Sequence, residues 1–284
     1  MNEKRFPWLL LCWGIGLLTS PALASESENI FRLGEGIDEV VLGYSGEADL
    51  PPPVRSSQKM GVGAQILVQS NPYRDGDTVV MALPMITYVG ERFFVVSPRA
   101  GVHLYRHPIG GINAIADFRF KGEAFESKGF LSGMEDRKNT AMAGLDGHLR
   151  LPGRYRVDLT AMTDILDRHN GQEVNLALSR VFRLQHLMLI PGAGVVWRSA
   201  DYNDYYYGVR ASEATEARPS YNPGDGLPNT LEWFARLAFR YDLTPNWSLA
   251  SAVRVEVLGS EVRDSPTVRR DYLTTFIAGV NYFF

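Results

Sequence analysis

Residues 271–284 read D-Y-L-T-T-F-I-A-G-V-N-Y-F-F and end the chain on an aromatic side chain, Phe284. Every second residue counted back from Phe284 is aromatic, apolar or threonine, while most of the intervening positions are smaller or polar. Side chains of a β-strand alternate between the two faces of a sheet, so this pattern predicts a strand with one apolar face. Strands of soluble sheets can alternate in the same way.

The aromatic ending favours a membrane barrel over a soluble sheet. Outer-membrane β-barrels commonly close with a strand that ends in an aromatic residue, which the barrel insertion machinery is expected to recognise. Tyr282 and Phe284 are therefore the predicted residues of a barrel-closing strand, and the insertion machinery is a predicted partner.

The alternation recurs upstream in segments of roughly 10–12 residues, the length that a tilted strand needs to cross a bilayer. Soluble strands are usually shorter, at about 5–6 residues. Charges of both signs, such as Asp117 with Arg119 and Arg254 with Glu256, recur on the face opposite the apolar one, which in a membrane barrel is the polar interior. The other predicted strands are residues 38–46, 60–69, 78–89, 92–106, 111–121, 140–151, 154–165, 173–183, 187–198, 231–241 and 247–258.

Together these segments predict an all-β fold, an antiparallel transmembrane β-barrel of 12 strands. Residues 60–284 form its main part, and residues 38–46 supply a short first strand. Pro98 interrupts the segment 92–106, which can be one strand or two, and 10 strands is the alternative count.

Connections of two lengths alternate along the predicted barrel. Such barrels have short periplasmic turns and longer outer loops, so the chain is expected to end in the periplasm. The predicted turns are residues 152–153, 185–186 and 243–246, and the predicted loops are residues 122–139, 167–172, 201–230 and 261–270.

The N-terminus predicts export to the cell outer membrane. A basic start precedes an apolar run at residues 6–18, which is too short for a transmembrane helix of about 20 residues, and an A-x-A site ends at Ala24. This pattern indicates a signal peptide over residues 1–24 that is cleaved after Ala24; a short membrane anchor is the alternative. Residues 25–59, with three consecutive prolines, are expected to be a flexible lead.

Cysteine content and charge exclude several kinds of function. Cys12 is the one cysteine and lies in the predicted signal peptide, so the mature chain would have no disulfide framework. Leu11 is too large for the position before a lipid-modified cysteine. Cleavage changes the formal net charge from −3 to −4, and a mildly acidic exported protein is poorly suited to nucleic-acid binding. Outer-membrane lipid and lipopolysaccharide are the expected surroundings.

Four stretches carry a resemblance to a known family. They are G-V-G-A at residues 61–64 with Pro72-Tyr73, G-M-E-D-R at residues 133–137, the tyrosine-rich residues 204–226, and D-S-P at residues 264–266. In this order and spacing they resemble the MipA/OmpV family of outer-membrane proteins over residues 60–284. The resemblance implies a scaffold that joins a lytic murein hydrolase to a murein synthase, or an osmotic-response or adhesion-related protein.

Residues for catalysis or metal binding do not form a known pattern. The five histidines lack metal-ligand spacing such as H-E-x-x-H, and no G-x-S-x-G context marks a nucleophile. His148 lies beside Asp146 on the predicted inner face, where charged side chains are usual in small barrels. We therefore predict no catalytic residue, cofactor or metal, and no enzyme activity.

The loop at residues 201–230 holds the candidate contact residues, Tyr205, Tyr206, Tyr207 and Tyr221. Aromatic side chains are enriched at contact sites, so one interpretation is that they touch a partner, glycan or ligand. The other is that the loop folds into the barrel mouth and the tyrosines pack there.

Three functions follow from the sequence. The first is an envelope scaffold for murein-remodelling enzymes, which rests mainly on the resemblance. The second is a small pore, although lumen-facing arginine and aspartate side chains would fill a narrow interior. The third is a surface adhesin or osmotic-response protein that uses the long outer loops.

Overall fold

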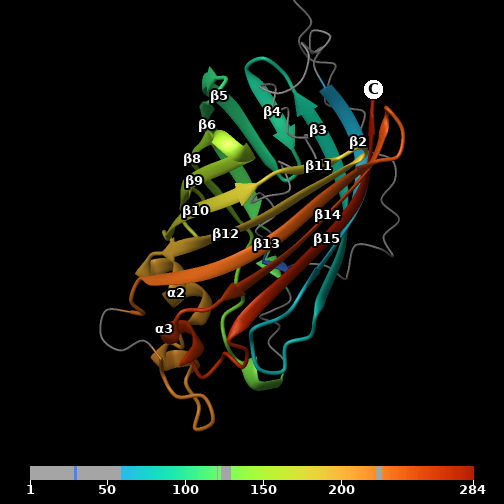
Figure 1. The fold of residues 1–284 in the computed structure, drawn as a ribbon. Helices are drawn as coiled ribbons and strands as arrows, with labels where there is room; N and C mark the ends of the chain where they lie inside the picture. Colours follow the sequence, from blue (N-terminus) through green and yellow to red (C-terminus); the bar gives the residue numbers. More distant parts are fainter. Residues whose placement is uncertain (1–28, 31–58, 120, 123–128, 222–225) are drawn as a thin grey trace, which may run out of the picture.

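A computed structural model describes residues 29–30, 59–119, 121–122, 129–221 and 226–284. These residues form a closed antiparallel β-barrel (Figure 1). The C-terminus lies at one end of the barrel, called here the turn end, and the helices α2 (Ala200–Tyr207) and α3 (Ser260–Arg263) lie at the other, the loop end. Within the described residues, no helix is long and apolar enough to cross a membrane.

Twelve strands form the wall, and a short additional strand, β11, continues β10 beyond Val181. The sheet closes because β15 pairs with β2 and β10 pairs with β12. The twelve wall strands are β2 (Lys59–Gln69), β3 (Val79–Val89), β4 (Phe93–Val96), β5 (Arg99–His107), β6 (Gly110–Arg119), β8 (Thr140–Leu151), β9 (Tyr155–Asp164), β10 (Gln172–Arg180), β12 (Leu187–Arg198), β13 (Thr230–Asp242), β14 (Trp247–Val257) and β15 (Tyr272–Phe283). The additional strand β11 spans Phe182–Leu184.

Smaller elements complete the described fold. Strand β1 (Asn29–Ile30) pairs with β7 (Lys121–Gly122), which continues β6 at the loop end. Three short 3₁₀ turns are η2 (Gly129–Leu131), η3 (Pro152–Arg154) and η4 (Ala211–Glu213).

The predicted count of 12 strands is confirmed, but the strands that make it up differ from those expected. The segment 92–106 supplies two strands, β4 and β5, with the chain turning at Ser97 and Pro98. Pro98 has no N–H group for a sheet ladder, which explains why one strand does not run through it. The predicted first strand at residues 38–46 and the cleavage site after Ala24 lie outside the described residues.

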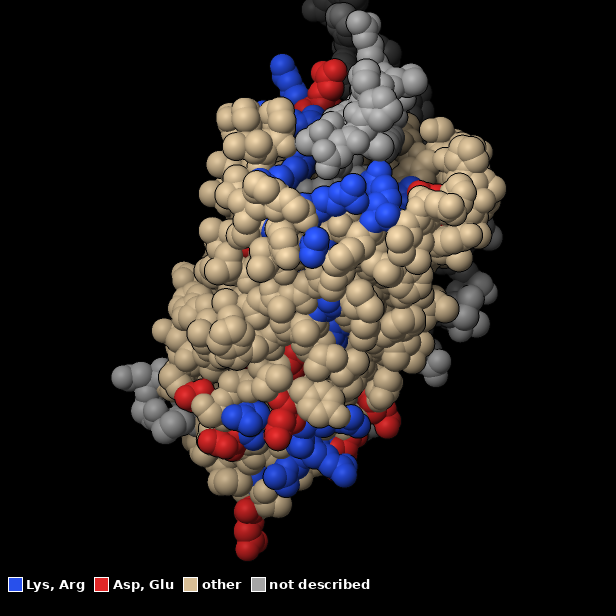
Figure 2. All heavy atoms as spheres, in the orientation of Figure 1, with Lys and Arg blue, Asp and Glu red and all other residues tan. Residues whose placement is uncertain are grey.

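The two faces of each strand differ as the alternation predicted. On β13, Trp233 is 66% exposed on the outer face, while its neighbour Phe234 is 4% exposed on the inner face. Figure 2 shows that charged side chains gather toward the two ends, with a largely uncharged belt between them. A soluble protein rarely exposes such a continuous apolar surface, whereas a membrane barrel turns it toward lipid.

The barrel interior is less polar than the sequence indicated. Inward-facing Met81 and Met85 of β3 pack with Met142 of β8 and Met162 of β9. We call this apolar side of the lumen the methionine wall. Long, unbranched methionine side chains suit such a cluster because they can fill irregular spaces. Its other buried members are Leu67, Phe94, Val96, Ile115 and Ile277.

The wall is incomplete on one side of β3. The hairpin of β4 and β5 is short, so residues 79–85 pair with β2 but with no described strand on their other side. The Ile86 carbonyl accepts from Ser97 N (3.0 Å) on that side, and alternate residues of a strand share a side. Pro84 therefore directs its missing N–H toward the open edge, which is where proline is tolerated in a sheet.

Candidate functional site

The loop end is covered by a folded cap rather than by separate loops. Tyr73 after β2, Met134 before β8, Tyr206 of α2, Val262 of α3 and Val268 before β15 belong to one buried cluster. Its other buried members are Leu131, Tyr202, Tyr207, Val209, Leu227 and Leu258. Loops far apart in the sequence thus share a small hydrophobic core of their own.

Helix α2 forms the centre of the cap. Its N-cap is Ser199, whose hydroxyl accepts a hydrogen bond from Tyr202 N (3.4 Å), and Asp201 places a negative charge in the first turn. Tyr202 and Tyr206 lie four residues apart on one helical face and pack ring against ring, with centroids 4.7 Å apart. The helix ends at Gly208, whose N–H donates to the Asp204 carbonyl (2.9 Å).

The four candidate contact tyrosines differ in accessibility. Tyr206 and Tyr207 are buried in the cap, at 4% and 6% exposure. Tyr205 and Tyr221 are half-buried at its edge. Tyr205 accepts from Lys138 N (2.8 Å), and Tyr221 donates to the Glu261 carbonyl (2.8 Å). Of the four tyrosines, only Tyr205 and Tyr221 are therefore accessible to a partner in part.

Arg218 joins two loops of the cap by hydrogen bonds to main-chain carbonyls. It is 2% exposed, and its guanidinium donates to the carbonyls of Phe130, Ser132 (3.1 Å) and Glu213 (2.7 Å). A guanidinium has five N–H donors in a fixed fork, so one side chain can satisfy several carbonyls that the loops leave unpaired. Arg218 therefore fixes the loop before β8 against the loop before β13.

His169 lies under α2 in a ring of tyrosines. Its ring centroid is 5.2 Å from that of Tyr202, 5.7 Å from that of Tyr205 and 5.5 Å from that of Tyr206. The Nδ1 atom accepts from Gly171 N (2.9 Å), so the neutral ring carries its proton on Nε2. Burial lowers the pKa of His169, and this effect outweighs the nearby Asp164 carboxylate, which acts in the opposite direction.

A layer of buried ion pairs lies in the lumen beneath the cap. Arg198 of β12 is 2% exposed and is paired with Glu173 (3.5 Å), Glu232 and Glu256, which come from three other strands. We call this the ion layer. It consists of Arg99, Arg119, Arg198 and Arg254 with Asp117, Glu173, Glu232 and Glu256.

The ion layer balances its charges within the described residues. Arg119 lies between Glu173 (3.3 Å) and Asp117 (3.9 Å), and Arg99 binds Asp117 through two hydrogen bonds of 2.6 and 2.8 Å. Buried charges are costly to desolvate, and this cost is offset only when each has partners in good geometry. The Arg198 guanidinium also lies 5.5 Å from the Tyr202 ring centroid, so the ion layer is in contact with the cap.

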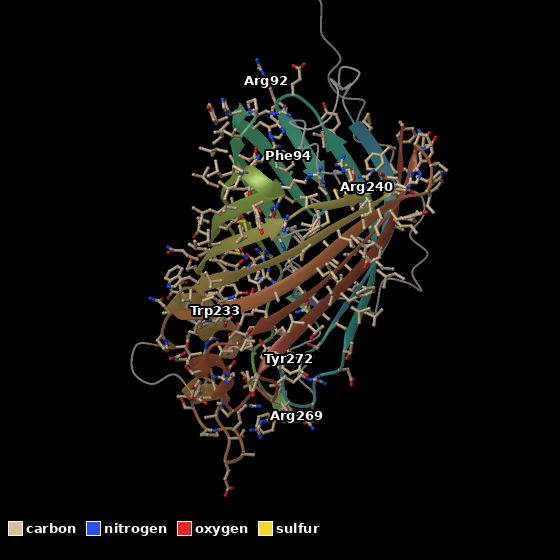
Figure 3. All side chains as sticks on the ribbon, in the orientation of Figure 1. Arg92, Phe94, Trp233, Arg240, Arg269 and Tyr272 are labelled. Atoms are coloured by element: carbon tan, nitrogen blue, oxygen red, sulfur yellow. The ribbon has the colours of Figure 1, made fainter. Side chains whose placement is uncertain are left out.

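Toward the turn end, one side of the lumen carries arginines. Arg156 of β9, Arg236 of β13 and Arg254 of β14 lie in one register row, and Arg183 and Arg240 flank Met188 nearer the mouth. We call these five residues the arginine wall. Figure 3 shows Arg240 near the turn end, with Trp233, Tyr272 and Arg269 nearer the loop end.

Carboxylates of the described residues bind several guanidiniums of the arginine wall. Asp158 pairs with both Arg156 (2.6 Å) and Arg236 (3.9 Å), and Asp242 pairs with Arg240 (2.6 Å). Arg254 belongs to both the arginine wall and the ion layer, and its partner Glu256 also binds Arg198. Met142 and Met162 of the methionine wall instead lie in register with the ion layer, opposite Asp117 and Glu173.

The outer rim of the turn end is also basic. Arg92, Arg106, Arg154 and Arg180 are exposed there, and Glu91 and Asp242 are the exposed carboxylates among its described turns and strand ends. Arg180 lies between the rings of Tyr155 and Phe182, 4.9 Å from each centroid. Such cation–π contacts suit the interface between lipid and water.

Metal-binding groups are absent from the part of the chain that the structure describes: no three His, Cys, Asp or Glu side chains are placed to hold a metal ion. His148 and Asp146 face the lumen from β8, and Asp146 accepts from Asn113 Nδ2 (2.7 Å). His103 bonds the same Asn113 through its Nδ1 atom (2.8 Å). This is a polar network between neighbouring strands.

The sequence patterns missed the ion layer and Arg218. The sequence showed pairs of opposite charges two residues apart on one strand. The ion-pair partners of Arg198, in contrast, lie on other strands. A signal was present, because Glu173, Arg198, Glu232 and Glu256 each fall on the inner face close to the loop end of a strand. Nothing in the residues around Arg218 indicated that it is buried.

Comparison with known proteins adds an independent result. The family model described as MltA-interacting protein MipA matches residues 61–284. The chain is 32% identical to the MltA-interacting protein of Escherichia coli over 233 residues, which covers 80% of this chain and 90% of that protein. It is 30% identical to the outer membrane protein OmpV of Vibrio cholerae, with 69% and 75% covered.

A solved structure with a similar barrel is an outer membrane channel from Pseudomonas putida. It has 12% sequence identity and a TM-score of 0.43, and the match covers 83% of this chain and all of that one. At that TM-score the likeness says nothing about function.

Proposed function

The chain belongs to the MltA-interacting protein MipA family, and we propose that this outer-membrane barrel acts as a scaffold that binds murein-remodelling enzymes at its turn end. The Escherichia coli relative is named for its interaction with MltA, a murein hydrolase. A hydrolase of this kind is the proposed partner here, together with a murein synthase.

One observation carries the proposal: the two ends of the barrel differ in what they offer to a partner. At the loop end, polar side chains donate hydrogen bonds to main-chain carbonyls of other cap segments. Examples are Arg218, Tyr73 and Tyr221. At the turn end, Arg92 and Arg106 are exposed on a rim with few carboxylates. With the turn end toward the periplasm, this rim faces the compartment that contains murein.

Site-directed crosslinking in whole envelopes tests the scaffold. A photo-crosslinking amino acid is placed at Arg92, Ile109 or Asn246 of the turn end, and at Glu216 or Arg263 of the loop end as matched controls. All five positions are exposed. We expect a murein hydrolase or synthase to be captured from the turn-end positions. Capture from neither end, or from the loop end alone, would overturn the proposal.

The ion layer favours the scaffold over a pore. Arg198 and Glu232 meet inside the lumen at 2% and 0% exposure, beneath a cap with its own hydrophobic core. We expect the purified protein to give no stepwise conductance in planar bilayers under conditions in which a general porin conducts. Steady conductance steps would instead support the pore.

A further inference from the structure

The outer surface of the barrel carries a row of large side chains near the loop end. Trp233 of β13, Val257 of β14 and Tyr272 of β15 lie opposite one another in register, and all three are exposed on the outer face. Tryptophan and tyrosine are enriched at the interface between lipid and water. This row, called here the outer girdle, therefore indicates the level at which lipid headgroups begin.

Three exposed arginines lie just beyond the outer girdle. Arg269 and Arg270 come directly before the strand that begins at Tyr272, and Arg74 lies in the loop after β2. Figure 3 shows Arg269 near Tyr272 and further toward the loop end. Figure 2 shows basic side chains, with acidic ones among them, at this border of the uncharged belt. We call the three arginines the outer arginine cluster.

An isolated antiparallel bridge between Tyr73 and Val268 fixes two of these arginines. The main-chain N–H groups of Arg74 and Arg269 donate the two hydrogen bonds that flank the bridge, each of 2.8 Å. The bridged residues are buried in the cap, so Arg74 and Arg269 project from the opposite face of the bridge. Diagonal neighbours of this kind lie about 7–8 Å apart, a spacing at which two long side chains can reach one anion.

The guanidiniums of the cluster suit a phosphate ligand. Among the described residues, no carboxylate forms an ion pair with Arg74, Arg269 or Arg270, and the nearby Asp75 accepts a hydrogen bond from Phe130 N (3.2 Å). The planar fork of a guanidinium matches the oxygens of a phosphate group. Because the main chain already holds the arginines together, less order is lost when an anion binds.

We propose that the outer arginine cluster binds the phosphate groups of a lipopolysaccharide molecule in the outer leaflet, with its acyl chains along the outer girdle. A lipid fits better than free phosphate because the cluster borders an apolar surface, and a lipid offers both an anionic headgroup and acyl chains. The ionic part of the attraction weakens as salt is added. The proposal uses the orientation with the loop end outward, but it does not depend on enzyme binding at the turn end.

Binding of defined lipids to the purified protein tests the ligand. The protein is freed of lipid in mild detergent, and bound lipopolysaccharide is measured by native mass spectrometry, with intact lipid and with lipid whose phosphates have been removed. We expect the intact lipid to bind at least several-fold more tightly. Equal binding of the two forms would overturn the proposal. Inorganic phosphate that competes as well as the whole lipid, or tighter binding of phosphatidylglycerol, would also overturn it.

Two triple variants test the location of the site. The changes R74Q, R269Q and R270Q remove the cluster, and R92Q, R106Q and R168Q remove three exposed arginines elsewhere as a matched control. Folding of both is checked by heat-modifiability gels. We expect the first set to weaken lipopolysaccharide binding several-fold and the control set to bind like the wild type.

The outcomes that contradict this location are distinct from a failure of the scaffold. Equal weakening in both sets would show a general attraction of charge, and no weakening in the first set would place the lipid elsewhere. Either result would overturn the proposal. Loss of murein-enzyme capture at the turn end, with lipid binding unchanged, would overturn the scaffold alone.

Discussion

The hydroxyl of Tyr73 donates a hydrogen bond of 2.8 Å to the main-chain carbonyl of Tyr206, 133 residues further along the chain. The first loop of the barrel is thereby tied to the helix that covers the mouth. Tyr73 is 3% exposed, and its ring also lies against Tyr207, with centroids 5.8 Å apart. Tyr73 therefore contacts two consecutive residues at the end of α2.

Replacing Tyr73 with phenylalanine should loosen the cap while leaving the barrel folded. The change keeps the ring but removes the hydroxyl, and a typical hydrogen bond contributes about 1 kcal/mol. We expect faster proteolysis in residues 199–229 of Y73F, measured by time-resolved limited digestion. The control is Y105F, whose side chain is exposed on β5. Equal digestion of the two variants would show that the bond does not hold the cap.

Removing Arg198 should destabilise the barrel strongly. R198A leaves Glu173, Glu232 and Glu256 without their shared cation, and breaking a buried ion pair costs about 3–5 kcal/mol. The measurement is the temperature at which the folded form is lost on heat-modifiability gels. R269A, at an exposed position, should stay within about 0.5 kcal/mol of the wild type. A small effect of R198A would mean that the carboxylates are protonated or solvated.

Replacing Gly194, on the inward face of β12, with a larger residue should impair folding. A Cβ atom there would lie 2.2 Å from the Leu176 carbonyl oxygen and 2.6 Å from the Phe234 ring. Overpacking of this kind costs about 1–3 kcal/mol. We expect G194V to reduce folded yield, while A193V, on the exposed outer face, folds normally. Normal folding of both would indicate that the strands can separate locally.

Cap stability should fall in mild acid because of His169. Its folded-state pKa is lowered below the ordinary value of 6.5, so below that pH the unfolded cap binds a proton that the folded cap does not. The stabilisation is thus complete above about pH 6.5 and is lost progressively as the pH falls toward the lowered pKa. Protease resistance of the cap should drop between pH 7.5 and 5, and H169F should reduce that drop. An identical drop in H169F would assign it to other groups.

Local sequence predicted the wall well because strand alternation is a local property. Trp233 and Phe234 are adjacent, and the period of two alone places them on opposite faces. The same rule does not predict which side chains of other strands the inner face contacts. Met81 and Met85 lie on one strand, and only the curvature of the closed sheet brings them against Met142.

The cap and the ion layer depend on contacts between distant segments. Tyr206 is buried because loops before β3, β8, β13 and β15 converge on it, and no spacing within residues 201–230 encodes that convergence. Arg198 likewise finds Glu256 across 58 positions because β12, β13 and β14 are in register. Pro84, inside a predicted strand, was a local signal of the open edge on β3, since proline is rare within paired strands.

Surface loops usually tolerate substitution and vary among related proteins. The cap described here constrains that freedom. Because Arg218 reaches the carbonyls of Phe130 and Ser132, a change in one loop alters the fit of another. Variation at the loop end should therefore be correlated between loops rather than independent. The loop end would then change slowly, because a new residue in one loop needs a compatible residue in another.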